Sequence, residues 1–117
     1  MAVRSNILTT PVQVWTTTTT FSNCVHLKAD PNNTASIAYA ITSNATTSSV
    51  TIDSAITTTT NDATIGFLLA AGDEVYIHPR EFVQVGINPA QGGGYDARNV
   101  WVIAATTGGQ RVYGRAE

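Results

Sequence analysis

Apolar and polar side chains alternate with a period of two along most of the chain, whereas helical periodicity is hard to find. In residues 24–29 every second side chain is apolar, so Val25, Leu27 and Ala29 share one face of a predicted strand. Residues 30–33, with the sequence DPNN, then supply a strong turn. We therefore expect a half-buried β-strand that ends in a loop.

The same alternation recurs in residues 36–41, where the large side chains of Ile37, Tyr39 and Ile41 share one face. The opposite face carries only serine and alanine. Small side chains on that face allow a close approach by another part of the chain. We expect something to pack closely against these alanines.

Two segments predict hairpins. Residues 66–78, GFLLAAGDEVYIH, contain two strand patterns around the turn AGD, where Gly72 suits the unusual backbone angle and Asp73 can bond to the local backbone. Residues 99–105 and 110–114 are separated by the turn residues TTGG in the same way. We expect the second pair to form a closing hairpin.

Residues 81–88, EFVQVGIN, also alternate and predict a further strand. The whole chain then contains about eight to ten short strands, which is typical of an all-β fold, an antiparallel β-sandwich or a jelly-roll-like domain. No linker or change in composition divides it, so we expect a single β domain over residues 1–117, with residues 1–10 as a candidate extended N-terminal arm.

Two threonine runs stand out, VWTTTTTF at residues 14–21 and ITTTTN at residues 56–61. Threonine suits a strand, but a run that is alike on both faces specifies pairing register only weakly. The runs are either solvated edge strands or loops, or uncharged surfaces that pack against another subunit, because hydroxyls cost less to desolvate than charges. On the second interpretation the candidate protein-contact residues are Thr16, Thr18, Thr20, Thr57, Thr59 and Tyr95.

Charge argues against direct nucleic-acid binding. Only 12% of the 117 residues are charged, the net charge is -2, and the single lysine and scattered arginines form no basic stripe. Threonine makes up about one residue in six, and apolar residues make up a normal 43%. We expect a surface covered mainly by uncharged polar groups.

Neither cysteine usage nor hydropathy points to secretion or to a membrane. Cys24 is alone, so it has no intrachain disulfide partner. The first 15 residues lack the apolar core of a signal peptide, and no apolar run approaches the roughly 18 residues of a membrane span. We expect a soluble protein that is synthesised in the cytoplasm and has no membrane partner.

No catalytic, metal or cofactor site can be assembled from the sequence. Cys24 and His26 lie two positions apart on one strand face, about 6–7 Å from each other, without a nearby acid or amide to orient the imidazole. Adding His78 or the pair Asp73-Glu74 gives no known metal-ligand spacing. The glycines at 92–94 lack the Lys-Ser/Thr of a phosphate-binding loop. We expect a protein that is not an enzyme and needs no cofactor.

A sugar-binding groove is a further alternative. Trp15, Trp101, Tyr95 and Tyr113 could stack on a glycan, although aromatic residues spread over a β domain more often belong to the core or to an interface.

Three segments taken together carry a resemblance to known proteins: CVHLKADPNNTASIAYAI, LLAAGDEVYI and ARNVWVIAATTGGQRVYG. Their order resembles a loose group of small virion proteins of tailed bacteriophages. In that group a strand ending in ADP-x-N-T is followed by a turn L-x-A-G-[DE], a strand V-[YW]-V and a glycine-containing hairpin. The chain departs from the group at Ala35, where glycine is common, in the long Thr-rich stretch 42–64, and in the insertion 78–95.

The resemblance implies a structural protein of the virion. The main function that the resemblance implies is that of a capsid decoration or cement protein, which stabilises the shell. Such a protein would bind the major capsid protein and also copies of itself, as a dimer or trimer. The alternative is a tail, head-fibre or spike component with a receptor- or glycan-binding role. Small proteins that occupy many equivalent positions on a shell gain from symmetry and avidity.

Overall fold

The computed structural model describes residues 1–9, 11–41, 65–89, 92–104, 106 and 108–117. Ten strands, one short α-helix and one 3-10 turn make up the described chain. In chain order they are β1 (Ala2–Ile7), β2 (Val12–Gln13), β3 (Thr20–Phe21), β4 (Val25–Ala29), β5 (Ile37–Ile41), β6 (Ile65–Leu69), β7 (Glu74–Ile77), α1 (Pro79–Gln84), β8 (Tyr95–Asp96), η1 (Ala97–Asn99), β9 (Val100–Ala104) and β10 (Gln110–Ala116).

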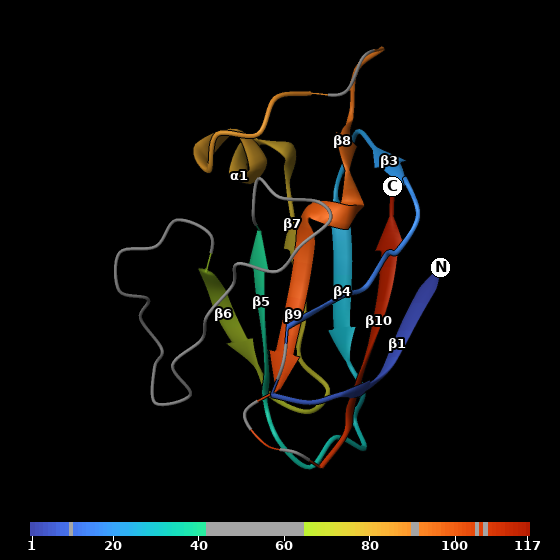
Figure 1. Ribbon diagram of the computed structural model, residues 1–117, viewed down its shortest axis with the longest axis vertical. Coiled ribbons are helices and arrows are strands. Elements are labelled where there is room, and N and C mark those ends of the chain that lie inside the picture. The colour runs from blue at the N-terminus through green and yellow to red at the C-terminus, as the bar shows by residue number, and fades with distance from the viewer. Residues whose placement is uncertain (10, 42–64, 90–91, 105, 107) are drawn as a thin grey trace.

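The strands form two four-stranded antiparallel sheets and one small two-stranded sheet (Figure 1). The first sheet has the order β1-β10-β4-β7, and the second has the order β2-β9-β5-β6. The short strands β3 and β8 pair above them. The prediction of an all-β antiparallel sandwich is confirmed.

The core lies between the two four-stranded sheets. The first sheet contributes alternate residues such as Val25, Leu27 and Val112, and the second contributes Tyr39 and Val102. Strand β4 therefore has the alternation that the sequence predicts, with buried and half-buried residues in strict turn. Because each sheet covers the apolar face of the other, the opposite face of the first sheet is turned away from the core.

Strand β5 is buried at all five positions, and so is its neighbour β9. Ala40 lies opposite Trp101 in the antiparallel pair, and these two side chains form a small apolar cluster of their own. The prediction that something packs closely against the alanines is confirmed at Ala40.

Both predicted hairpins are wrong as pairings. The turn at Gly72 and Asp73 joins β6 to β7, yet these strands lie in different sheets, and the turn after β9 likewise crosses to β10 in the other sheet. The local turn geometry is as expected, since Gly72 has a φ of 84° and an Asp73 carboxylate oxygen accepts from the Ala70 N–H over 3.1 Å. The strands separate because two apolar faces are buried more fully when they stack than when they lie side by side.

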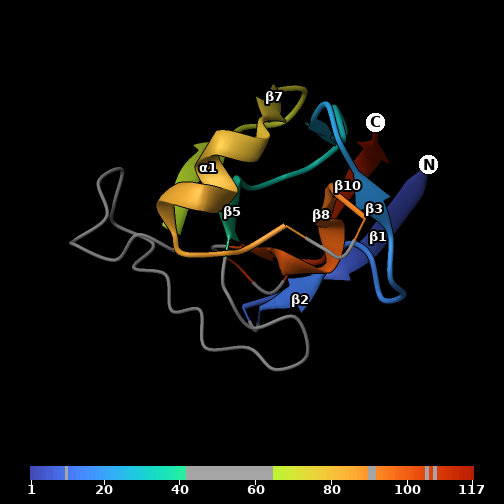
Figure 2. The same ribbon diagram turned by 90° about the horizontal axis from the view of Figure 1, so that it is seen from above.

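The predicted strand over residues 81–88 is wrong as well, because α1 occupies residues Pro79–Gln84. Pro79 stands in the first turn, and the Glu81 carboxylate accepts from the His78 backbone N–H over 2.6 Å, which satisfies a donor at the helix start. Only Phe82 of this helix is buried. Figures 1 and 2 place α1 across one end of the sandwich.

The first threonine run is a loop for most of its length rather than a strand. Only its last residue, Thr20, lies in β3, while residues 16–19 connect β2 to β3. The aromatic residues that flank the run, Trp15 and Phe21, are both buried and hold its two ends in the fold. The second run lies outside the described residues.

Most of the N-terminal segment proposed as a candidate arm lies within the first sheet. Ala2–Ile7 forms β1, an edge strand that pairs with β10 from Ala2↔Gly114 to Ile7↔Gln110. The register is interrupted before Ile7, where Asn6 takes a φ of 56°, a left-handed conformation that asparagine tolerates. The chain's two ends therefore lie side by side (Figures 1 and 2).

Candidate functional site

The outward surface of the β1-β10-β4-β7 sheet gathers the side chains best suited to binding. On β4 the alternation that buries Leu27 directs His26 and Lys28 outward, and on β10 it directs Tyr113 and Arg115 outward. We call this surface the outer face. Its members are Met1, Val3, Glu74, Tyr76, His26, Lys28, Tyr113 and Arg115.

Strand register arranges the outer face in cross-strand rows. One row runs Val3, Tyr113, Lys28, Glu74, and the next runs Arg115, His26, Tyr76. Directly opposite residues have Cβ atoms about 4.5–5.5 Å apart, so side chains within a row are near neighbours.

Exposed apolar side chains concentrate on this face. Four large apolar residues of the described chain are strongly exposed, and three of them belong to the outer face: Met1 at 90%, Val3 at 51% and Tyr76 at 50%. The fourth, Val83 at 56%, lies on α1. Met1 and Val3 lie at the β1 edge of the sheet and Tyr76 lies on the other edge strand, β7, so they flank the charged side chains of β10 and β4. Apolar side chains that border polar ones on a single sheet face suit a contact surface.

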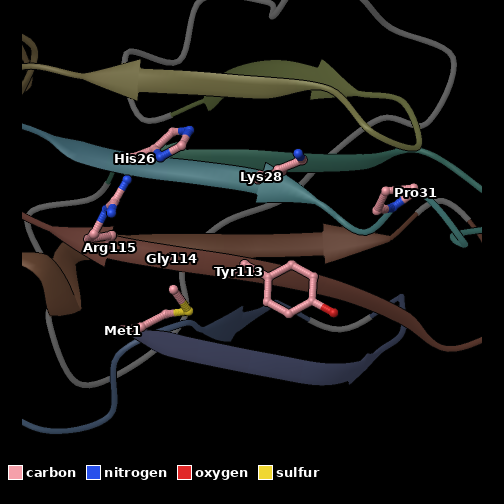
Figure 3. Close-up of a pocket in the computed structure, with 7 residues that line it drawn as sticks. All are labelled: Met1, His26, Lys28, Pro31, Tyr113, Gly114 and Arg115. Atoms are coloured by element: carbon pink, nitrogen blue, oxygen red, sulfur yellow. The ribbon is translucent and has the colours of Figure 1, made fainter.

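A depression of about 350 Å³ lies in the outer face. Figure 3 shows its lining side chains, which come from the start of β1, from β4 and the turn after it, and from β10. They are Met1, His26, Lys28, Pro31, Tyr113, Gly114 and Arg115. Every charged or ionisable group of the lining apart from the tyrosine is basic.

His26 is held by two neighbours on β7. Its Nε2 lies 3.0 Å from Glu74 Oε1, and its ring stacks on Tyr76 with centroids 4.2 Å apart and an interplanar angle of 3°. The acid that sequence reasoning could not find near His26 therefore comes from the neighbouring strand. This cluster fixes the orientation of the imidazole at one side of the depression.

Tyr113 is fixed at the other side by Asp30. Its hydroxyl donates to Asp30 Oδ2 over 3.0 Å. The Asn32 backbone N–H, which donates to Asp30 Oδ1 over 2.8 Å, is the main cause that lowers the pKa of Asp30; burial opposes it, while Tyr113 and Arg111 act in the same direction. Asp30 is therefore an anion that anchors the turn after β4 and holds the tyrosine in place.

Side-chain amides attach that turn to β10. Asn33 exchanges two hydrogen bonds with the Arg111 backbone, accepting from N–H over 2.8 Å and donating to C=O over 2.9 Å. The buried Gln110 accepts from the Thr34 and Ala35 N–H groups over 2.8 and 3.1 Å. The border of the outer face is thus built on a rigid turn rather than on a free loop.

Of the residues predicted as protein contacts, Thr20 and Tyr95 lie on the paired strands β3 and β8. Thr16 and Thr18 are exposed on the loop before β3, and Thr20 is exposed on β3 itself. Tyr95 is half-buried and packs against Phe21 and Phe82, with ring centroids 6.2 and 5.6 Å apart. Thr57 and Thr59 lie outside the described residues.

The four aromatic residues considered for a sugar groove do not line one common surface. Trp15 and Trp101 are buried, and Tyr95 belongs to an internal aromatic cluster. Tyr113 alone of the four lines the depression.

Cys24 has the properties of an inert thiol. Burial, and next the Glu117 carboxylate, raise the pKa of the Cys24 thiol, while Arg115 opposes them. Its Sγ lies 4.0 Å from Glu117 Oε2, where the thiol acts as a donor. A protonated thiol is a poor nucleophile, so the geometry does not favour a Cys24–His26 catalytic pair.

Sequence reasoning missed the outer face as a site. Val3, Lys28, Tyr76 and Arg115 belong to segments far apart in the chain, and nothing in any one segment marks them. The available signal was the outward half of each alternating strand, which could be recognised as one surface only when the strand order was known.

Within the described ranges, no group of three or more His, Cys, Asp or Glu residues could hold a metal ion. The described part of the chain also has no helix long and apolar enough to cross a membrane. No protein-family model matches the chain, and comparisons with curated proteins and with solved structures find no significant match.

Proposed function

We propose that this protein is a non-enzymatic structural component of a virus particle, a decoration or cement protein that binds the assembled capsid through its outer face. The observation that carries the proposal is that three of the four strongly exposed large apolar side chains of the described chain lie on one sheet face, Met1 and Val3 at its β1 edge and Tyr76 at its β7 edge. A surface of this kind suits contact with another protein. The order of sequence segments that resembles small phage virion proteins supplies the context.

The size of the outer face indicates how such binding would work. Four strands about 4.8 Å apart and roughly six residues long cover on the order of 400 Å², about half of what one partner buries in a standard interface. One such contact is weak. A protein that self-associates as a dimer or trimer and binds many equivalent sites gains the missing affinity through avidity.

A second contact would enlarge the interface. Thr16 and Thr18 expose uncharged hydroxyls on a loop, so they stay candidates for this role. Their contribution to capsid binding is a prediction. Replacing both threonines by lysine in the shell-binding experiment below tests it.

The test is co-sedimentation of the purified chain with shells that lack it, from the phage that carries its gene. We expect saturable binding, with immunogold label over the head in negative-stain images. Val3→Glu should weaken binding at least tenfold, because it places a charge in the apolar part of the outer face. Val83→Glu is the matched control, since Val83 is equally exposed but lies on α1.

Two results would overturn the proposal. Label confined to the tail would move the protein to the tail, fibre or spike alternative. Shell binding that Val83→Glu weakens as much as Val3→Glu would remove the outer face from the contact.

A further inference from the structure

The depression in the outer face has a charge pattern that specifies the chemistry of its occupant. Its lining contains three basic side chains, those of Lys28, Arg115 and His26, and the hydroxyl group of Tyr113. No carboxylate lines it. At about 350 Å³ it lies at the small end of binding cavities, with room for one or two side chains rather than a large ligand.

Three acids lie near the depression, and each is already engaged. Asp30 accepts from the Tyr113 hydroxyl over 3.0 Å and lies 3.8 Å from Arg111. Glu74 lies beside His26 at 3.0 Å, and Glu117 lies 3.5 Å from the guanidinium Nε of Arg115. All three carboxylates stand outside the lining of the depression. They hold the positions of Tyr113, His26 and Arg115 but do not fill the space between the basic groups.

Lys28 is the basic group available to a partner. Glu74 lies directly opposite it in the β4–β7 register, yet the carboxylate is directed to His26 instead. Across the described part of the chain, no ion pair involves Lys28. An ammonium group on a partly covered sheet face attracts an anion more strongly than it would in bulk water, because its surroundings screen charge less.

Lys28 and Arg115 can act on the same anion. They lie on the neighbouring strands β4 and β10, in adjacent cross-strand rows, and such diagonal neighbours are about 7–8 Å apart. In Figure 3 the two side chains extend to different sides of His26, so both rotate about their flexible stems when one carboxylate accepts from both, as in other charge-assisted pairs. Tyr113 and Pro31 offer apolar surface beside it for the stem of an acidic side chain.

We propose that this depression binds an acidic side chain, aspartate or glutamate, from an exposed segment of the capsid protein. The inference rests on the proposed function for the identity of the partner, and on the basic lining for its chemistry. Lys28 and Arg115 hold the carboxylate, and the apolar groups around them exclude water from the contact.

The first experiment tests the chemistry without any capsid. The isotopically labelled chain is titrated with hexaglutamate, and the backbone amide resonances are followed by NMR. We expect saturable shifts at Lys28, Tyr113 and Gly114, which weaken when salt is raised. Lys28→Glu should weaken the apparent affinity about tenfold or more, and Arg80→Glu, which makes the same charge change on α1, should leave it unchanged.

The second experiment repeats the shell co-sedimentation with the same two variants, and Lys28→Gln replaces Lys28→Glu if the latter unfolds. We expect shell binding to fall about tenfold or more for the Lys28 variant and to persist for Arg80→Glu. If the wild-type chain does not bind shells but still binds hexaglutamate at this face, the proposed function is rejected and the acidic-ligand site is kept.

Three outcomes would overturn the inference. Hexaglutamate could give no saturable shifts at the outer face. The Lys28 variant could bind shells as tightly as the wild type. Glucuronate, a carboxylated sugar, could give saturable shifts where hexaglutamate gives none, which would assign the depression to a glycan instead.

Discussion

Gly114 offers the most direct test of how the two sheets pack. It lies on the inward side of β10, where a Cβ atom would stand 2.6 Å from Cη2 and 2.9 Å from Cζ2 of Trp15, and 3.1 Å from Cγ1 of Val14. Contacts below 3.0 Å do not occur between real Cβ atoms and other groups, so something must shift. Trp15 is buried and has little space to move.

The expected cost of Gly114→Ala combines two opposing effects. Alanine in a strand interior is favoured over glycine by about 0.5–1 kcal/mol, because glycine loses more backbone entropy on folding. Overpacking a filled core costs typically about 1–3 kcal/mol. We expect net destabilisation of about 1–2 kcal/mol, which lowers the melting temperature of a domain this size by roughly 5–10 °C.

Thermal unfolding followed by circular dichroism measures this cost. The matched control is Gly108→Ala, where the nearest atom to a new Cβ is Nε2 of Gln110 at an ordinary 3.4 Å, so no loss of stability is expected. In a Trp15→Phe background the clash is relieved, and Gly114→Ala should cost less by about 0.5 kcal/mol or more. If Gly114→Ala melts at or above the temperature of Gly108→Ala, the packing of Trp15 on β10 is refuted.

Three further predictions concern the supports of the fold. Gln110→Ala removes the acceptor of two backbone N–H groups and should lower the free energy of unfolding by about 2 kcal/mol in urea titrations. Burial raises the pKa of Asp96, but hydrogen bonds from Arg98 and the Thr19 N–H outweigh it, so the folded pKa lies below the unfolded one. The stability that Asp96 contributes is therefore present above about pH 4 and is lost as the pH falls through the folded pKa. Urea unfolding of the wild type and of Asp96→Asn at pH 7 and at pH 3 measures this, and the difference in their free energies of unfolding should be smaller at pH 3. Tyr95→Ala should cost about 2 kcal/mol, because this ring packs against two phenylalanines, and an unchanged melting temperature would contradict that role.

Alternation in the sequence predicts the strands well and their partners poorly. Val25, Leu27 and Ala29 are buried as expected, and β9 and β10 lie where the apolar patterns place them. A period of two specifies which side chains share a face, but it does not specify which strand lies alongside. The turn after β9 has hairpin chemistry and nonetheless joins two sheets, because stacking the sheets buries both inner faces.

The misassigned helix had signals that alternation obscured. Phe82, Val83 and Val85 suggest a strand, but Pro79 in the first helical turn and Glu81 two positions later are typical of a helix start. For the threonine run the sequence left a strand and a loop open, and the structure shows a loop up to Thr19. A segment with equivalent faces gains little from pairing at any one register, so it connects β2 to β3 as a loop between two buried aromatic anchors, Trp15 and Phe21.

The same period-two alternation of side chains produces both the outer face and the core. On β4 and β10 the inward positions hold the sandwich together, and the positions between them are free to differ without loss of packing. Surface substitutions away from buried networks usually change stability by less than about 0.5 kcal/mol. Variants at Lys28, Arg115 or Val3 should therefore affect binding while the fold persists, whereas variants at Gln110 or Gly114 affect the fold first. This separation is what makes a binding role for the outer face testable in isolation from the stability of the sandwich.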